Sequence, residues 1–301
     1  MPKKPKRHHI VPQFLLKLFL EKDATTIFLY DKLQDKTEQR NPKNTMVFSN
    51  FNTIGESTKL EEFYGQIESD SAPVIRKLIK QKSFRNIKHA EKKRLFYFVL
   101  MQHIRTFIVR QAIEDMSRSC VFQAIQIMES EGKLSDPKKI KIADWIREGL
   151  VEIEIDKDHI RQEVANLRIY FSKQLPYLME NKKFLLFHSE SPSFYISDSG
   201  VVLSGGSYNG GAGINSPGIE IYLPLSSRIM LAIVDQSLHP HLDENNFLSI
   251  PKKILEKHNE LQTLWAERYI VCAQDNFELA KEALAEYPDS KIGTMRKLKI
   301  N

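Results

Sequence analysis

Between residues 60 and 180, apolar side chains recur every three or four positions, which is the period of an amphipathic helix. This spacing predicts helices over residues 60–82, 90–131, 138–150 and 158–179. Pro73 is expected to divide the first of these in two, because proline removes a backbone donor inside a helix. Residues 90–131 contain no Pro or Gly and are apolar on most faces, so we expect one long, buried, central helix, or two. Trp145 is expected to point inward, and core positions are predicted for the helical aromatics Phe96, Phe98, Phe107, Phe122, Tyr170 and Phe171.

The rest of the chain contains short β-branched and aromatic runs separated by Pro, Gly and Ser, a pattern typical of strands and turns. A short helix is predicted at 14–20, a hairpin from strands at 25–30 and 36–40, and further strands at 183–188, 193–197, 219–223 and 229–234. Helices return at 252–269 and 277–286, with a last strand near 269–273. Helices around a small, mostly antiparallel sheet define the α+β class.

The domain organisation is predicted to be simple, because no linker interrupts the pattern. We expect a flexible basic arm at residues 1–7 and a single α+β domain over residues 8–301. Within that domain, residues 8–55 form an N-terminal hairpin region, residues 58–180 a helical region, and residues 183–301 the sheet with the C-terminal helices.

Composition narrows the classes of function. The 301 residues carry a net charge of +6, which mildly favours a polyanionic partner such as nucleic acid, although solvated basic ends would give the same total. Two cysteines, Cys120 and Cys272, are too few for a disulfide framework or a cysteine-rich zinc site, so a cytoplasmic location is expected. No apolar run approaches the ~20 residues of a membrane span, so no membrane partner is expected.

Six short motifs, taken in order, carry a family resemblance that covers about residues 7–275. The chain resembles the domain of unknown function 4238 family, a largely bacterial family, which implies positions of interest but no assigned activity. The family's usual Thr-Ser-Asp-Asn-Pro is here Ile196-Ser-Asp-Ser-Gly200, a departure that changes the turn after Asp198. The motifs are His8 to Leu16, Phe28 to Asp31, Gln102-x-x-Arg105-Thr106, Phe194 to Ser199, Ile221 to Ser226, and His258-Asn259 with Ala266 to Ile270.

The adjacent histidines His8 and His9 are the strongest candidates for functional residues in the sequence, because an imidazole can move protons or bind a metal near neutral pH. The run from His8 to Pro12 is similar to the first strand of HNH-type nucleases. That similarity implies one histidine that activates water and a neighbour that helps to hold a metal. The motif also needs an asparagine some tens of residues on and then another histidine. The next histidine is His89, so the motif is incomplete, and a structural histidine or a differently assembled site stays open.

Other polar residues stand out at strand ends and within apolar helices. Asp198 follows a predicted strand, where a carboxylate suits a metal ligand, a general base or an ordinary turn. Gln102 and Arg105 lie three apart and therefore share a helix face, where arginine can recognise phosphate or form a buried ion pair, with Asp198 as one partner. A flexible hairpin loop is predicted for the glycine-rich residues 204–213. Ligand contacts are predicted for Gln13, Gln102, Ser197, Asn259 and Arg268.

Two hypotheses of function follow, from different classes. In the first, the protein is a metal-assisted nuclease: His9 is the general base, His8 and Asp198 hold Mg²⁺, Mn²⁺ or Zn²⁺, and Arg105 stabilises the transition state. In the alternative, it is a non-catalytic binding module that recognises a small anionic ligand or an acidic peptide through the Arg, Gln and His side chains. A scaffold in which these side chains form a buried network is a third reading.

Overall fold

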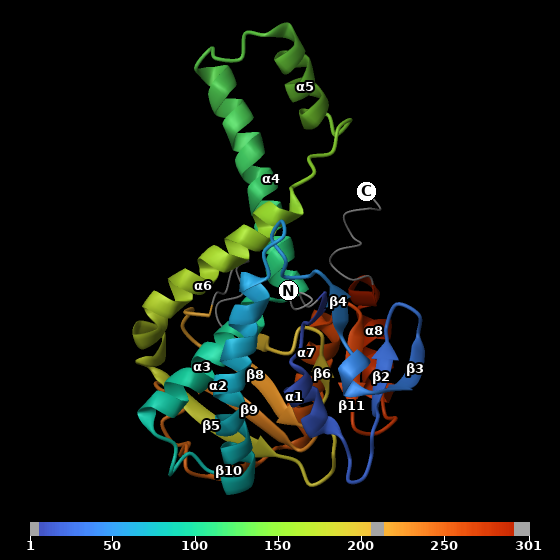
Figure 1. Ribbon diagram of the computed structural model, residues 1–301, viewed down its shortest axis with the longest axis vertical. Helices are drawn as coiled ribbons and strands as arrows, with labels where there is room; N and C mark the ends of the chain where they lie inside the picture. Colours follow the sequence, from blue (N-terminus) through green and yellow to red (C-terminus); the bar gives the residue numbers. More distant parts are fainter. Residues whose placement is uncertain (1–5, 206–213, 292–301) are drawn as a thin grey trace.

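The computed structural model describes residues 6–205 and 214–291 and shows an α+β fold (Figure 1). The first two-thirds contribute most of the helices and the last third most of the sheet. The helices are α1 (Gln13–Leu16), α2 (Lys59–Gln81), α3 (His89–Ile104), α4 (Phe107–Ser130), α5 (Pro137–Arg147), α6 (Lys157–Met179), α7 (Lys252–Trp265) and α8 (Glu278–Glu286), with 3-10 turns η1 (Lys17–Phe19), η2 (Pro42–Asn44) and η3 (Pro288–Lys291). The strands are β1 (Arg7–His9), β2 (Ile27–Asp31), β3 (Lys36–Arg40), β4 (Val47–Ser49), β5 (Lys182–His188), β6 (Ile196–Ser197), β7 (Val202–Gly205), β8 (Ile219–Ser226), β9 (Ile229–Asp235), β10 (Phe247–Ser249) and β11 (Tyr269–Cys272).

Three sheets organise the described residues. The largest has the order β10-β5-β9-β8-β7 and is antiparallel except for the β10–β5 pair. The second has the order β3-β2-β11-β6 and is antiparallel throughout, so the predicted N-terminal hairpin is confirmed and is extended by strands from near the C-terminus. The third is the short antiparallel pair β1–β4.

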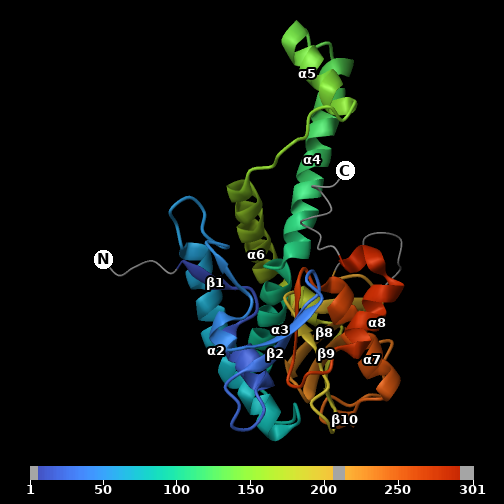
Figure 2. The ribbon, with the colours of Figure 1, turned by 90° about the vertical axis from the view of Figure 1, so that its right-hand side faces the viewer.

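Helices cover these sheets on different sides (Figure 2). The helices α2, α3 and α6 pack together and against the five-stranded sheet, where Phe96 and Phe184 meet edge to face with ring centroids 5.9 Å apart. The helices α7 and α8 cover the four-stranded sheet, where Tyr30, Ile270 and Phe277 belong to a second buried cluster. The chain therefore has a main core beneath α3 and a smaller one beneath α8.

The predicted break at Pro73 is wrong, because α2 runs through this residue to Gln81. Proline removes a single N–H from the helix ladder. The buried face of Val74, Ile75 and Leu78 continues on the far side, and its burial outweighs the lost bond. Of the two alternatives for residues 90–131, one helix or two, the structure shows two. The helix α3 ends at Ile104, and Thr106 caps α4 by accepting the N–H of Val109 at 3.5 Å.

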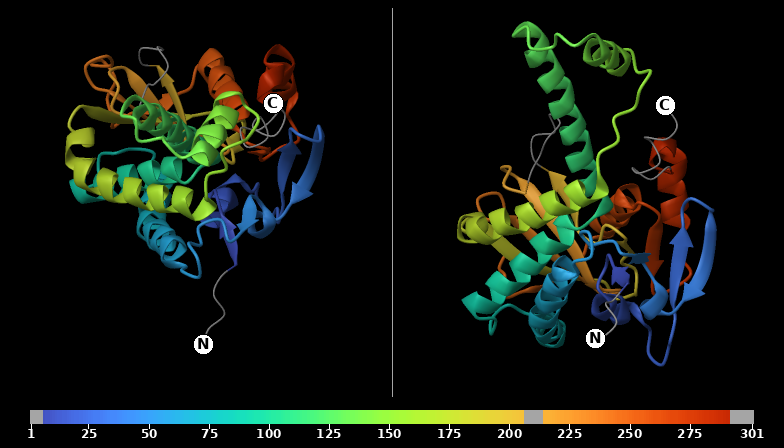
Figure 3. Two further views of the ribbon diagram at one scale, coloured as in Figure 1. Left: turned by 90° about the horizontal axis from the view of Figure 1, so that it is seen from above. Right: turned by 45° about the horizontal axis from the view of Figure 1, so that its top comes forward.

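Burial along α4 and α5 is the main departure from the sequence prediction. The helix α3 is buried as expected, but α4 is exposed beyond Ile113, and it projects with α5 from the body (Figures 1 and 3). The inward orientation predicted for Trp145 is wrong, since 37% of this residue is exposed. The core positions predicted for Phe122 and Tyr170 are wrong for the same reason. Helical periodicity identifies an apolar face but not what covers it.

Residues 206–213 lie outside the described residues, so the predicted glycine-rich loop is described only at its edges. The same holds for the basic arm before Lys6. Among the helices that the structure describes, none combines the length and apolar character needed to cross a membrane.

Candidate functional site

The first histidine of the pair is part of a buried polar network. Antiparallel pairing of β1 with β4 brings His8 against the loop that follows β4. There the backbone N–H of Asn52 donates to His8 Nδ1 at 2.9 Å, while the side-chain amide of Asn52 donates to Glu61 at 2.7 Å. Arg110 donates to Asn52 Oδ1 at 2.7 Å, and burial lowers the pKa of this guanidinium to about 10. Because His8 Nδ1 accepts the backbone N–H of Asn52, its lone pair is not free for a metal.

Gln102 and Arg105 share one helix face, as predicted, and form a further buried chain of hydrogen bonds, which together with that of His8 makes up the first network. Arg105 donates to Gln102 Oε1 at 2.6 Å and to Glu68 Oε1 at 2.7 Å, and Gln102 donates to the carbonyl of Ile10 at 3.1 Å. Arg105 is 2% exposed and Gln102 is 1% exposed. The carboxylate that pairs with Arg105 is therefore Glu68 of α2 and not Asp198.

His9 differs from His8 in having a ring nitrogen without a partner. Its Nε2 is buried and makes no hydrogen bond within the described residues. Burial lowers the pKa of His9, while the carbonyl of Pro42 and the charge of Glu68 act in the opposite direction. His9 is therefore a neutral imidazole at pH 7, near the Arg105–Glu68 ion pair.

Asp198 is fully buried and accepts three backbone N–H groups at the start of β11. Its oxygens lie 2.8 Å from the nitrogen of Glu267, 2.9 Å from that of Arg268 and 3.0 Å from that of Tyr269. Burial raises the pKa of Asp198 to about 6, although these donors and Lys32 favour the ionised form. The carboxylate thus joins β6 to β11. Its assignment as a metal ligand stays a prediction, to which these contacts give no support.

Asp198 and the residues around it form the second network. Gln262 of α7 accepts both the backbone N–H of Ser197, at 2.8 Å, and its hydroxyl, at 2.7 Å, and donates to the carbonyl of Gly200 at 2.8 Å. Asn259 accepts the N–H of Tyr195 at 2.9 Å. These side chains fix the β6 segment to α7 and leave little hydrogen-bonding capacity for a ligand.

Gly200 joins the two networks. It adopts a positive φ of 65°, and a Cβ at this position would lie 2.9 Å from Nε2 of Gln102. Only glycine fits this conformation without strain. The Gly200 that departs from the family pattern is therefore the residue that lets the strand-end motif pack against the Gln102–Arg105 helix.

Two predicted contact residues contribute no side chain to these networks, although the backbone N–H of Arg268 donates to Asp198. Arg268 donates two hydrogen bonds to Asp31 Oδ2, at 2.6 and 2.8 Å, and its side chain is one-third exposed. Gln13 is the first residue of α1 and is partly exposed. The structure brings His8, His9, Gln102 and Arg105 together in one region and Ser197, Asp198 and Asn259 in a neighbouring one.

A metal site does not fit the donors in these networks. Among the residues that the structure describes, no group of three or more His, Cys, Asp or Glu side chains is arranged to hold a metal ion. His8 Nδ1 accepts a backbone N–H, and the Asp198 oxygens accept three.

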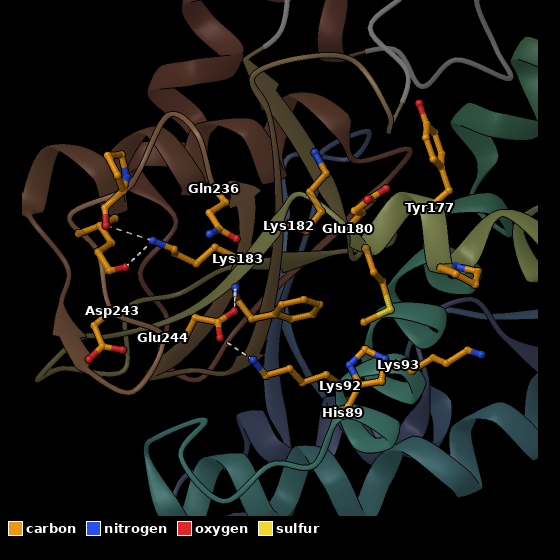
Figure 4. A pocket seen from close by; sticks show the side chains of 15 residues that line it. His89, Lys92, Lys93, Tyr177, Glu180, Lys182, Lys183, Gln236, Asp243 and Glu244 are labelled. Atoms are coloured by element: carbon orange, nitrogen blue, oxygen red, sulfur yellow. Dashed lines mark hydrogen bonds and ion pairs between the residues drawn. The ribbon is translucent and has the colours of Figure 1, made fainter.

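An open cavity lies elsewhere, between the first turns of α3, the end of α6, the start of β5 and residues 236–244 (Figure 4). Its volume is about 870 Å³. We call it the lysine pocket, because basic side chains dominate two of its walls. Its lining includes His89, Lys92, Lys93, Lys182 and Lys183, with the acidic Glu180, Asp243 and Glu244 and the apolar or aromatic Tyr177, Met179, Phe184 and Leu242.

The four lysines of the pocket have different partners. Lys92 pairs with Glu244, and Lys183 donates to the carbonyls of His239 at 2.8 Å and Leu242 at 2.7 Å, so both hold the 236–244 segment in place. Lys182 is only 5% exposed, and its nearest carboxylate oxygen, on Asp235, is 3.9 Å away. Burial lowers the pKa of Lys182, which is the sign of an incompletely compensated cation. Lys93 makes no ion pair within the described part of the chain.

Sequence reasoning missed this pocket, although two signals were present. Lys92-Lys93 and Lys182-Lys183 are each a pair of cations at the start of an element, next to apolar residues. Nothing in the sequence indicates that α3 and β5, about 90 positions apart, face each other. The partners Glu61 and Glu68 could not be predicted either, because nothing distinguishes them in the sequence from other polar residues of a helix.

The fold and site together define an α+β protein with two buried polar networks and, apart from them, an open, lysine-lined pocket. Residues 7–276 match the family model described as a protein of unknown function, DUF4238. The chain therefore belongs to the domain of unknown function 4238 family, as its six motifs predicted. No curated protein and no solved structure matches the chain.

Proposed function

We propose that the chain is a binding protein for a small anionic ligand, and that the ligand occupies the lysine pocket. The observation that carries this proposal is the side chain of Lys182, a nearly buried cation that lines an open cavity and lies 3.9 Å from the carboxylate of Asp235. An anion bound beside the Lys182 ammonium group would supply negative charge that compensates for its burial. The proposal keeps the predicted anionic ligand but moves it away from Arg105 and Gln102, because those side chains are already paired.

Three further features favour an anion of moderate size. The cavity volume lies within the range of about 300–1,000 Å³ that is usual for small-molecule sites. His89 and Lys93 come from the first turns of α3, where the helix dipole favours negative charge. Met179, Phe184 and Tyr177 offer an apolar wall for the rest of the ligand. The expected class is therefore a molecule that carries a phosphate or a carboxylate on an apolar or ring-shaped body.

A thermal-shift screen with inorganic phosphate, ADP and small dicarboxylates tests this proposal. At about 100 times its dissociation constant, a ligand stabilises the fold by about 2.7 kcal/mol, which raises Tm by about 5 °C in a chain of this size. The shift should disappear in Lys93→Ala and Lys182→Met. Lys252→Ala, at an 88% exposed side chain at the start of α7, is the matched control and should shift like the wild type. A ligand that shifts all four proteins equally would place the site elsewhere.

A nuclease is a second candidate, favoured by the unpartnered Nε2 of the neutral His9. In this reading His9 accepts a proton from the attacking nucleophile, while Arg105, paired with Glu68 and Gln102, acts only as a neighbouring structural residue. The order of β1, β4 and α2, two antiparallel strands and a helix, is consistent with the HNH resemblance. Asn52 and Glu61 would then stand where that motif places its asparagine and its second histidine. Nucleic acid is the partner in this reading, and a cytoplasmic location suits both candidates, since Cys120 and Cys272 are free thiols.

Incubation with labelled single-stranded DNA, duplex DNA and RNA tests the second candidate. Reactions with Mg²⁺, Mn²⁺, Zn²⁺ or EDTA decide whether a metal contributes. His9→Gln should reduce cleavage by at least about 100-fold, the usual contribution of a general base. His241→Gln, at an exposed histidine outside both networks, should have no effect. Cleavage that is equal in wild type and His9→Gln would contradict the assignment.

A further inference from the structure

The helical projection formed by α4 and α5 exposes an unusual amount of apolar surface. We call residues 116–156 the projecting arm (Figures 1 and 3). The described chain has 15 exposed large hydrophobic residues, and nine of them lie between positions 116 and 151. Single exposed apolar side chains need no explanation, but a concentrated patch marks an interaction site. The nine are Met116, Phe122, Ile127, Met128, Ile140, Ile142, Trp145, Leu150 and Val151.

The spacing of these residues fits a helix that packs against another helix. On α4, the exposed Met116, Cys120 and Ile127 are separated by four and then seven positions, so they form one seam along the helix. On α5, Ala143 is buried, while Ile142 and Trp145 remain exposed. Each helix of the arm therefore presents an apolar face that nothing in the described chain covers.

The charge of the arm indicates the nature of its partner. Residues 116–156 contain six Lys and Arg against eight Asp and Glu, a net charge of −2, whereas the whole chain has a net charge of +6. An acidic surface is repelled by anionic lipid and by nucleic acid. A second copy of this chain carries acidic and basic segments that can meet it.

The charges within the arm are separated along its length. Lys138, Lys139 and Lys141 lie at the start of α5, at the far end of the arm. Glu148, Glu152, Glu154 and Asp156 lie on the segment that returns to the body, and no Lys or Arg occurs between positions 148 and 156. Two arms placed side by side in opposite directions would bring the basic end of each against the acidic base of the other. Such an arrangement is two-fold symmetric and self-complementary.

We propose that the projecting arm is a dimerisation element, which pairs in antiparallel fashion with the arm of a second copy of the chain. The arm is long enough for this role, because stable interfaces use about 20–30 residues from each partner. The apolar residues of α4 and α5 form the centre of the interface. The lysines of α5 and the carboxylates of residues 148–156 set the antiparallel direction.

Sedimentation equilibrium of the full-length chain tests the proposal. The wild type should be a dimer, and Ile127→Asp with Ile142→Asp should raise its dissociation constant at least 10-fold. Lys138→Glu with Lys139→Glu should also weaken the dimer, and adding Glu152→Lys with Glu154→Lys should restore it. The restoration is specific to antiparallel arms, since it requires the two charged segments to face each other.

Leu238→Asp provides the control, because Leu238 is 58% exposed but lies outside the arm. It should leave the dimer unchanged, and circular dichroism should show that every variant remains folded. A wild type that remains monomeric at the highest concentration tested would overturn the proposal. So would a dimer that survives the Ile127 and Ile142 substitutions, or a wild type that instead binds lipid vesicles through the arm.

Discussion

Replacing Asp198 by alanine is expected to lower the free energy of unfolding by about 4 kcal/mol or more, the largest effect of any single change considered. The substitution leaves the backbone N–H groups of Glu267, Arg268 and Tyr269 without their acceptor. Each unsatisfied buried group costs about 1–3 kcal/mol, and the lost side chain leaves a cavity as well. Urea unfolding followed by circular dichroism measures the difference.

Asp198→Asn separates hydrogen bonding from packing, because it keeps the shape and one acceptor oxygen. We expect it to lose about half as much stability as alanine. Asp275→Ala, at an exposed carboxylate, is the matched control and should change stability by less than about 0.5 kcal/mol. If Asp198→Ala were as stable as the control, the carboxylate would not be holding β6 to β11, and a role at a ligand would become the better explanation.

Replacing Arg105 by alanine is expected to cost about 3 kcal/mol. The loss leaves the buried Gln102 Oε1 without a donor and removes packing against the Tyr64 ring, whose centroid is 5.2 Å from the guanidinium carbon. Glu68 contributes less, because its side chain is 24% exposed and can be solvated. Chemical denaturation of the wild type and the variant measures the change.

A double variant tests whether the charge of Arg105 or its packing matters. Arg105→Met with Glu68→Gln restores bulk and removes the unpaired carboxylate, so we expect it to recover at least half of the lost stability. Equal losses in the single and double variants would show that Gln102 and the backbone it holds account for the whole effect. No loss in Arg105→Ala would contradict the network itself.

The local features of the fold could be predicted from the sequence. The β-branched run before Asp31 and the polar turn after it predict the β2–β3 hairpin, and the spacing of Gln102 and Arg105 predicts their shared face. Both depend on neighbours within a few positions. The N-cap of α6 is local as well, because Asp156 accepts the N–H groups of Asp158 and His159 at the start of the helix.

The long-range partners could not be predicted in the same way. The three backbone N–H groups that donate to Asp198 lie about 70 positions later in the chain, and the glutamate that pairs with Arg105 lies 37 positions earlier. Such contacts depend on which strands become neighbours, and periodicity does not determine this. The exposure of α4 was missed for another reason: an apolar helix face looks the same in sequence whether it packs against its own chain or against a partner.

Isothermal titration calorimetry of the lysine pocket tests the proposed function most directly. The ligand that gives the largest thermal shift among the phosphate and carboxylate probes should bind the wild type at one site per chain. The dissociation constant should rise at least 10-fold in Lys93→Ala and Lys182→Met and stay unchanged in Lys252→Ala. The absence of saturable binding by any of these probes, or the same affinity in all four proteins, would contradict the proposed function.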